Sequence, residues 1–341
     1  MTDVYELTET DKRKLRFLYR QSGISTRHSV IPDYSLPSVE WAFYPKPDEE
    51  KAFPGLERRM RWYERHAAEL SVDACIRCLS DTTKASEVTH LITVSCTGMS
   101  APGLDLQVME RLGLPPSVFR TSVNFMGCYA AIHAMKIADM VCRTDAAAKV
   151  LIVCTELCTL HFQREATPDN MASSLLFSDG SAALLMVPET HPGNGLRIDG
   201  FHSEVSSKGK SDMTWELSSK GFLMTLSGYV PDLIGEDIAG LVDRAMSRFG
   251  VDRSRITHWC VHPGGRRILE AVEKSLSLEK TALDASRKVL LGYGNMSSPT
   301  ILFVLKEMME DGSKIEDKGL FGVAFGPGLT METFLASPSE A

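Results

Sequence analysis

The sequence lacks the long apolar run that a membrane-spanning helix needs. Across its 341 residues no stretch approaches the ~18 consecutive apolar residues of such a helix. The first residues also lack a charged region followed by an apolar one, so no signal peptide is expected. We therefore predict a cytoplasmic protein with no membrane partner.

An excess of positive charge is also absent. The chain carries 37 Lys and Arg against 44 Asp and Glu, a net charge of −7. Proteins that bind nucleic acid broadly usually carry a basic surface, because the phosphate backbone dominates the affinity. This balance argues against nucleic acid as the partner.

The eight cysteines are not arranged in paired CxxC motifs. Cys75 and Cys78 form one such motif, but it falls inside a predicted helix with no second pair nearby. This distribution is typical of reduced thiols in a cytosolic protein rather than of disulfides or a zinc site. No metal and no resident cofactor are expected.

No Pro-, Gly- or Ser-rich linker divides the chain, and strand and helix patterns alternate along it. This alternation predicts an α/β protein with mostly parallel sheets and helices on both faces. Residues 1–193 and 194–341 repeat a similar order of elements, so we predict two fused halves. The predicted helices are 9–22, 60–79, a segment ending near 112, 129–143, 231–250, 266–276, 282–290 and 299–309. The predicted strands are 91–96, 150–155, 181–188, 197–205, 256–261 and a final run around 321–334.

Cys128 lies where a β-rich run becomes an Ala-rich helix. A thiol at a helix N-terminus is close to free backbone N–H groups and the positive end of the helix dipole, which favour the thiolate. A Gly-Cys pair before an apolar helix is, by itself, more often a buried structural thiol. A reactive cysteine therefore needs support from other residues.

Two glycine-bearing turns supply such support. His262 follows a predicted strand and precedes Pro-Gly-Gly, and Asn295 lies in the turn Gly-Tyr-Gly-Asn before a helix. Taken singly, each is an ordinary packed or turn residue. Together with Cys128 they provide a nucleophile, a base and an oxyanion donor, each at a junction where α/β sheets place active sites.

Five segments carry a family resemblance: GCYAA at 127–131, LLFSDGSAA at 175–183, WCVHPGG at 259–265, YGNMSS at 293–298 and FGPGLTMET at 325–333. Their set and order resemble the type III polyketide synthases of the chalcone and stilbene synthase superfamily, in a bacterial form. The resemblance implies the thiolase fold, with five αβαβα layers and two pseudo-duplicated halves. It also implies an acyltransferase that condenses malonyl-CoA onto an acyl-CoA starter, and a homodimer.

The same resemblance assigns roles to individual residues. Cys128 would carry the starter and the growing chain as a thioester. His262 would hold that cysteine as a thiolate and, with Asn295, would bind the thioester oxygen and promote decarboxylation of malonyl-CoA. The product would be an aromatic polyphenol or a pyrone.

Other matched positions are expected to shape the cavity. Phe177 occupies the gatekeeper position, and Gly326 to Gly328 would form a tight turn behind the cavity. At Trp215 the chain departs from the pattern of the plant enzymes. Its bulky indole would narrow the pocket and so favour a different starter or chain length. The remaining expected cavity residues are Cys96, Met224 and Ser297.

CoA is expected at a basic tunnel mouth. In the family its contacts come from the N-terminal helix, where Lys14 matches one position and Phe17 and Gln21 replace two others. The candidate contacts are Lys14, Arg16, Arg20 and Arg267.

Three alternatives remain open at this stage. A ketoacyl-ACP synthase III-like enzyme shares the Cys-His-Asn set, although its usual His-Gln-Ala-Asn and Asn-Thr-Ser segments are absent. A 3-hydroxy-3-methylglutaryl-CoA synthase would need a glutamate base near the cysteine, and no glutamate matches. A non-catalytic partner subunit of the same fold is the last, and the three catalytic residues argue against it.

Overall fold

A computed structural model describes residues 7–46, 52–191, 195–206, 208–310 and 319–339. Before residue 192 the order of elements is α1 (Glu9–Gln21), α2 (Leu56–Leu79), β1 (His90–Ser95), α3 (Leu104–Leu112), β2 (Phe119–Asn124), α4 (Ala130–Thr144), β3 (Val150–Leu157), α5 (Pro168–Leu176) and β4 (Asp179–Met186). After it come β5 (Leu196–Val205), β6 (Met213–Ser218), β7 (Gly221–Leu226), α6 (Val230–Phe249), β8 (Ile256–Val261), α7 (Arg266–Leu276), α8 (Asp284–Tyr293), α9 (Thr300–Glu310), β9 (Gly319–Gly326) and β10 (Thr330–Pro338).

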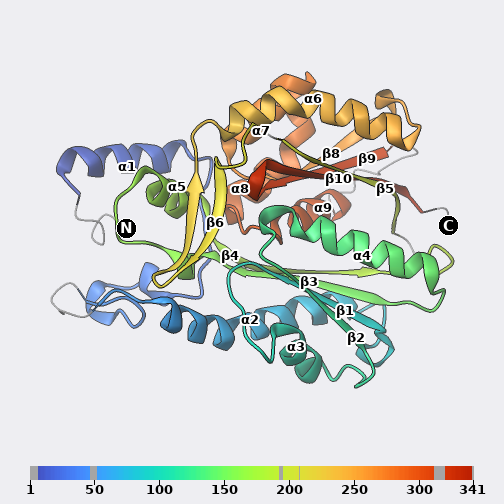
Figure 1. The fold of residues 1–341 in the computed structure, drawn as a ribbon, viewed down its shortest axis with the longest axis horizontal. Helices are drawn as coiled ribbons and strands as arrows, with labels where there is room; N and C mark the ends of the chain where they lie inside the picture. Colours follow the sequence, from blue (N-terminus) through green and yellow to red (C-terminus); the bar gives the residue numbers. More distant parts are fainter. Residues whose placement is uncertain (1–6, 47–51, 192–194, 207, 311–318, 340–341) are drawn as a thin grey trace.

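The chain packs into five layers (Figure 1). Helices α2 and α3 cover the outer face of the first sheet, and α6 and α7 cover the outer face of the second. Helices α4 and α9 lie between the two sheets and share one apolar core with both of them. The predicted αβαβα thiolase architecture is therefore confirmed.

The strand order is β2-β1-β3-β4 in the first sheet and β5-β10-β9-β8 in the second. The first sheet is parallel except for the β3–β4 pair. In the second sheet only β8 and β9 are parallel, while β10 runs antiparallel to both of its neighbours. Antiparallel pairing is thus more frequent than we expected, because the final run is two strands joined by the tight turn at Pro327–Leu329.

Helix α6 illustrates how local sequence sets an element. Pro231 lies in its first turn, and Gly250 ends it in the left-handed conformation, with φ 66°. Ile234, Ile238 and Leu241 are spaced three or four residues apart and are all fully buried. The predicted helix 231–250 is confirmed within one residue at each end.

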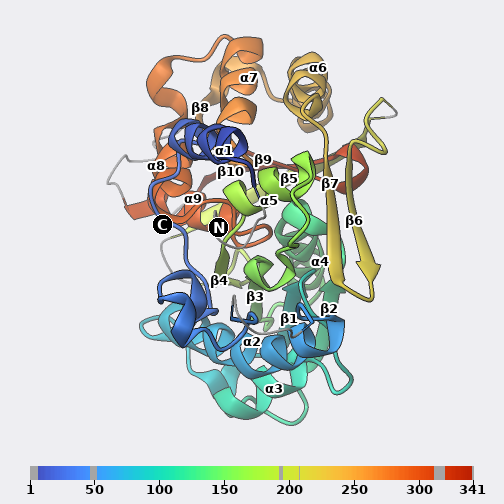
Figure 2. The same cartoon turned by 90° about the vertical axis from the view of Figure 1, so that its left-hand side faces the viewer.

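Helix α5 and strands β6 and β7 were not predicted. Helix α5 begins at a Thr167 N-cap, whose hydroxyl accepts a hydrogen bond from the Asn170 N–H group. Strands β6 and β7 form a two-stranded hairpin that stands outside both sheets, beside the layers (Figure 2).

In the described residues no helix combines the length and the apolar character needed to cross a membrane.

Candidate active site

A cavity of about 710 Å³ lies where the two halves meet. Cys128 precedes α4 and Asn295 precedes α9, so both central helices direct their N-terminal ends toward it. His262 follows β8 and lines the same cavity. The three predicted catalytic residues are therefore brought together from segments far apart in the chain.

A short helical turn, Gly127–Tyr129, holds Cys128 and leads directly into α4. Gly127 has φ 77°, and a Cβ there would overlap the Pro327 ring. Only glycine fits this position, since both the backbone conformation and the close approach exclude a side chain. The turn places the Cys128 sulfur in the cavity with 8% of the residue exposed.

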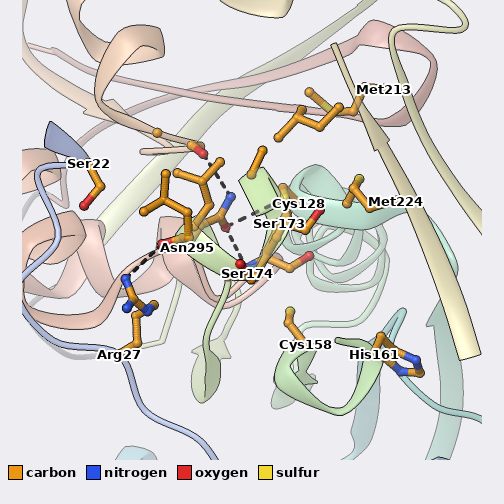
Figure 3. A pocket seen from close by; sticks show the side chains of 18 of the residues that line it. Ser22, Arg27, Cys128, Cys158, His161, Ser173, Ser174, Met213, Met224 and Asn295 are labelled. Atoms are coloured by element: carbon orange, nitrogen blue, oxygen red, sulfur yellow. Dashed lines mark hydrogen bonds between the residues drawn. The ribbon is translucent and has the colours of Figure 1, made fainter. Parts of the chain in front are cut away.

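Asn295 is a polar partner of the Cys128 thiol. The distance from Cys128 Sγ to Asn295 Oδ1 is 3.9 Å, and the two side chains point toward one another (Figure 3). The amide is fixed because Oδ1 accepts from the Ser297 N–H group at 2.8 Å and Nδ2 donates to the Gly264 carbonyl at 3.2 Å. One Nδ2 hydrogen remains for a substrate oxygen.

The His262 ring is buried, with 1% of the residue exposed, and its backbone N–H donates to the Val323 carbonyl at 2.9 Å. Neither ring nitrogen has a hydrogen-bond partner among the described residues. A buried ring with two unsatisfied nitrogens is costly and rare in folded proteins. This is the arrangement expected of a group that meets its partner only when substrate enters.

Burial moves both catalytic groups toward their neutral forms. It raises the pKa of the Cys128 thiol to about 11, although hydrogen bonds with Ser297 and Asn295 oppose the shift. It lowers the pKa of the His262 imidazole to about 3. Burial therefore opposes the thiolate expected at neutral pH, whereas the helix N-terminus favours it.

Cys96 and Ser297 lie side by side on the cavity wall, with 3.6 Å between Cys96 Sγ and Ser297 Oγ. Behind them is Glu156, which sequence reasoning missed. Its carboxylate is fully buried and accepts from the Cys96 N–H group at 2.9 Å and the Ser298 hydroxyl at 2.6 Å. A lone carboxylate within an otherwise apolar strand was the signal that could have revealed it.

The β6–β7 hairpin supplies another wall. Trp215 and Met224 are cross-strand partners on it, and both line the cavity as predicted. The Trp215 indole N–H donates to the Cys96 carbonyl at 2.7 Å. His161, another lining residue that was not predicted, stacks on Phe222 with ring centroids 4.2 Å apart.

The remaining expected cavity residues also lie near the site. Phe177 lines the cavity at the end of α5 and forms an isolated β-bridge with Asn295. Gly326 and Gly328 flank Pro327, which lines the cavity directly. A Cβ on Gly326 would be 2.5 Å from Tyr129 Cδ1, and Gly328 has φ 72°, so the expected tight turn is present.

Only one of the four predicted CoA contacts lines the cavity. Lys14, Arg16 and Arg20 are exposed on α1 and do not line the cavity. The residues of α1 that line the cavity are Leu18, Tyr19 and Gln21, and Leu15 on the same helix is buried. Arg267 does line the cavity, together with two basic residues that were not predicted, Arg27 and Arg266.

Within the described part of the chain, no three His, Cys, Asp or Glu side chains are grouped so that they could hold a metal ion.

Two family profiles cover nearly the whole chain. The profile "Chalcone and stilbene synthases, N-terminal domain" matches residues 2–189, and its C-terminal counterpart matches residues 203–338. The chain belongs to the chalcone and stilbene synthase family. Its activity is that of a type III polyketide synthase, an acyltransferase of the kind that uses CoA thioesters in condensation.

Individual relatives agree with this assignment. Type III polyketide synthase A of Arabidopsis thaliana is 30% identical, over 95% of this chain and 83% of its own length. Alpha-pyrone synthesis polyketide synthase-like Pks18 of Mycobacterium tuberculosis is 31% identical, over 95% and 82%. Of "Probable polyketide synthase 1" from Dictyostelium discoideum, 29% identical, the chain spans only 10% of the length.

Solved structures show the same fold. PKS-I of the brown alga Ectocarpus siliculosus has a TM-score of 0.89 at 28% identity, over 96% of this chain and 90% of that one. The 1,3,6,8-tetrahydroxynaphthalene synthase of Streptomyces coelicolor has a TM-score of 0.84 at 28% identity, with the same coverage. Nothing in these relatives supports the ketoacyl-ACP synthase alternative or a non-catalytic subunit.

Proposed function

We propose that this enzyme extends an acyl starter on Cys128 with malonyl-CoA and cyclises the product to an aromatic polyphenol or a pyrone. The observation that carries the proposal is the convergence of Cys128, Asn295 and the unpartnered His262 ring on one cavity. The name of the relative from Mycobacterium tuberculosis, which refers to alpha-pyrone synthesis, supports the pyrone class.

Loading begins with a neutral thiol and a neutral imidazole. The Cys128 sulfur attacks the starter thioester carbonyl while the thiol proton moves to a free His262 ring nitrogen. The carbonyl oxygen gains negative charge, which the Asn295 Nδ2–H group stabilises. The bond from the carbonyl to the CoA sulfur then breaks, and the CoA thiolate takes the proton from the imidazolium.

Extension needs no base. Malonyl-CoA loses carbon dioxide, and the electrons of the broken C–C bond form an enolate whose oxygen faces the Asn295 amide and the His262 ring. The enolate carbon attacks the acyl group on Cys128, a new C–C bond forms, and the cysteine sulfur leaves. Transfer of the longer chain back to Cys128 starts the next cycle. No resident cofactor takes part in this scheme.

Carbon-labelled malonyl-CoA, with and without acyl-CoA starters, tests the proposal. We expect release of labelled carbon dioxide and a new product that carries several labelled units. Failure to release carbon dioxide or form product would refute it. Use of malonyl-ACP while malonyl-CoA is ignored would favour a ketoacyl synthase instead.

The assembly and the location belong to the same proposal. We propose a homodimer in which the edge strand β2 meets a second copy, because Phe119 on this strand is 71% exposed. Light scattering of the purified protein should give twice the chain mass of 37.6 kDa.

A cytoplasmic location agrees with the eight free cysteines.

A further inference from the structure

A second cavity, of about 580 Å³, lies beside the turn of the β6–β7 hairpin. Its walls are formed by that turn, by residues 163–166 and by the residues at the start of α2, against which the turn packs (Figure 2). None of the three catalytic residues lines it. We infer that this cavity binds an oxyanion, a phosphate or a carboxylate group, which pairs with the buried guanidinium of Arg59.

Arg59 is a buried cation whose partners are neutral. Its side chain is fully buried and lines the cavity. Nε donates to the Pro54 carbonyl at 2.9 Å, and Nη1 donates to the Leu160 carbonyl. Nη2 has no hydrogen-bond partner among the described residues. A guanidinium keeps its charge in proteins, and a buried charge is costly unless an opposite charge compensates it. The chemistry of this side chain therefore favours an anionic ligand.

The other charged side chains on the wall add positive charge. Arg164 and Lys220 line the cavity together with Arg59, and Glu165 carries the one carboxylate among the described lining residues. Three cations against one carboxylate leave an excess of two positive charges. Lys220 Nζ lies 2.5 Å from Glu165 Oε1, and both side chains are more than half exposed. Exposed ion pairs of this kind add little stability, so the Lys220 ammonium group can turn toward a ligand at small cost.

The start of α2 supplies backbone donors to the same cavity. The helix has 24 residues, and its N-cap, Gly55, lines the cavity and provides no side-chain cap. The Leu56 N–H group donates to the Ser219 carbonyl at 2.9 Å. The N–H groups that follow have no partner within the helix, and the helix dipole favours negative charge at this end. Glu57, in the first turn, pairs with Arg61 on the exposed surface.

A bound oxyanion would connect the hairpin with the core. The hairpin turn packs directly on Arg59, because a Cβ on Gly221 would lie 2.8 Å from Arg59 Cδ, and Gly221 has φ 116°. The same hairpin carries Trp215 and Met224, which line the catalytic cavity. An anion held between Arg59 and Lys220 therefore links the turn to α2, and we expect it to slow hydrogen exchange in β6 and β7.

Two variants that each remove one positive charge test the site. Lys220→Ala alters the cavity wall, and Arg61→Ala is the matched control, because Arg61 is exposed on α2 and does not line the cavity. Arg59→Gln is the stronger change. Each protein is melted in sodium phosphate, in sodium acetate and in sodium chloride at equal ionic strength. Hydrogen exchange, followed by mass spectrometry of peptides, then locates the protection.

Phosphate or acetate should raise the melting temperature of the unaltered protein by about 3 °C above its value in chloride, since a ligand that binds the native state stabilises it. The same anion should slow hydrogen exchange in β6 and β7. Both effects should disappear in Arg59→Gln and persist in Arg61→Ala, and the apparent affinity should fall about three- to tenfold in Lys220→Ala. A response to phosphate alone assigns a phosphate ligand, and a response to acetate alone assigns a carboxylate.

Three results would overturn the inference. They are no rise with either anion, an equal affinity in Lys220→Ala and the unaltered protein, and protection confined to the mouth of the catalytic cavity instead of the hairpin. If Arg59→Gln is unfolded in chloride, the comparison of Lys220→Ala with Arg61→Ala decides the outcome.

Discussion

The two ends of the cavity are built in different ways. The catalytic end is made by glycine-bearing turns at the ends of core elements, and there Cys128, His262 and Asn295 are almost fully buried. The hairpin end is made by Trp215 and Met224 on two strands outside both sheets. The first end is held by backbone geometry and the second by side-chain contacts, so changes at the first should affect rate and changes at the second should affect product.

The largest effect should come from removing the nucleophile. Cys128→Ala should lower turnover of malonyl-CoA and an acyl-CoA starter by at least about 10³-fold, because no thioester can form. Product formation measures the loss. Cys158→Ala is the matched control, since Cys158 lines the same cavity and has no role in the scheme. Equal losses in both variants would place the chemistry elsewhere.

A smaller loss of activity is expected when the oxyanion donor, Asn295, is replaced. Asn295→Ala should reduce kcat by about 10²–10³-fold, the usual effect of removing one such donor. Asn170→Ala, on the cavity side of α5, should leave kcat nearly unchanged. Steady-state kinetics checks both variants, and thermal melting separates catalysis from folding. If Asn295→Ala retained full kcat, the amide would be only a structural residue.

The reactivity of Cys128 should depend steeply on pH. A raised pKa favours the protonated thiol, so below about 11 the thiolate fraction increases with pH. Alkylation by iodoacetamide should therefore rise about tenfold per pH unit between pH 7 and 9, or about 100-fold in total. Mass spectrometry of the Cys128 peptide gives the rate. A plateau below pH 8 that disappears in His262→Ala would instead indicate a thiolate–imidazolium pair.

Substitution of Trp215, at the hairpin end of the cavity, should change the product more than the rate of turnover. Trp215→Gly removes the indole and its hydrogen bond to the Cys96 carbonyl, which widens the cavity. We expect longer products or bulkier starters, with kcat changed only a few-fold. Leu217→Gly on the same strand is the control, because Leu217 is 57% exposed and does not line the cavity. Chromatography of the products should show no shift in this control.

The two ends also differ in what the sequence could reveal. The catalytic residues were predictable because each lies in a short motif whose turn depends on nearby residues, as at Gly127 before Cys128. The α6 boundaries were predictable for the same local reason. His161, Glu156 and Arg266 were missed because their positions depend on contacts between distant segments. The failure of Lys14, Arg16 and Arg20 to reach the cavity follows from the way α1 packs, which the sequence of the helix alone does not determine.

Peptide mass spectrometry of the acylated enzyme tests the central claim most directly. The enzyme is mixed with an acyl-CoA starter, quenched in acid and digested, and the acyl group is located on its peptide. The account predicts an added acyl mass on Cys128, no such mass in Cys128→Ala, and longer adducts after malonyl-CoA is added. An acyl group on another residue, or an adduct that persists in Cys128→Ala, would contradict it.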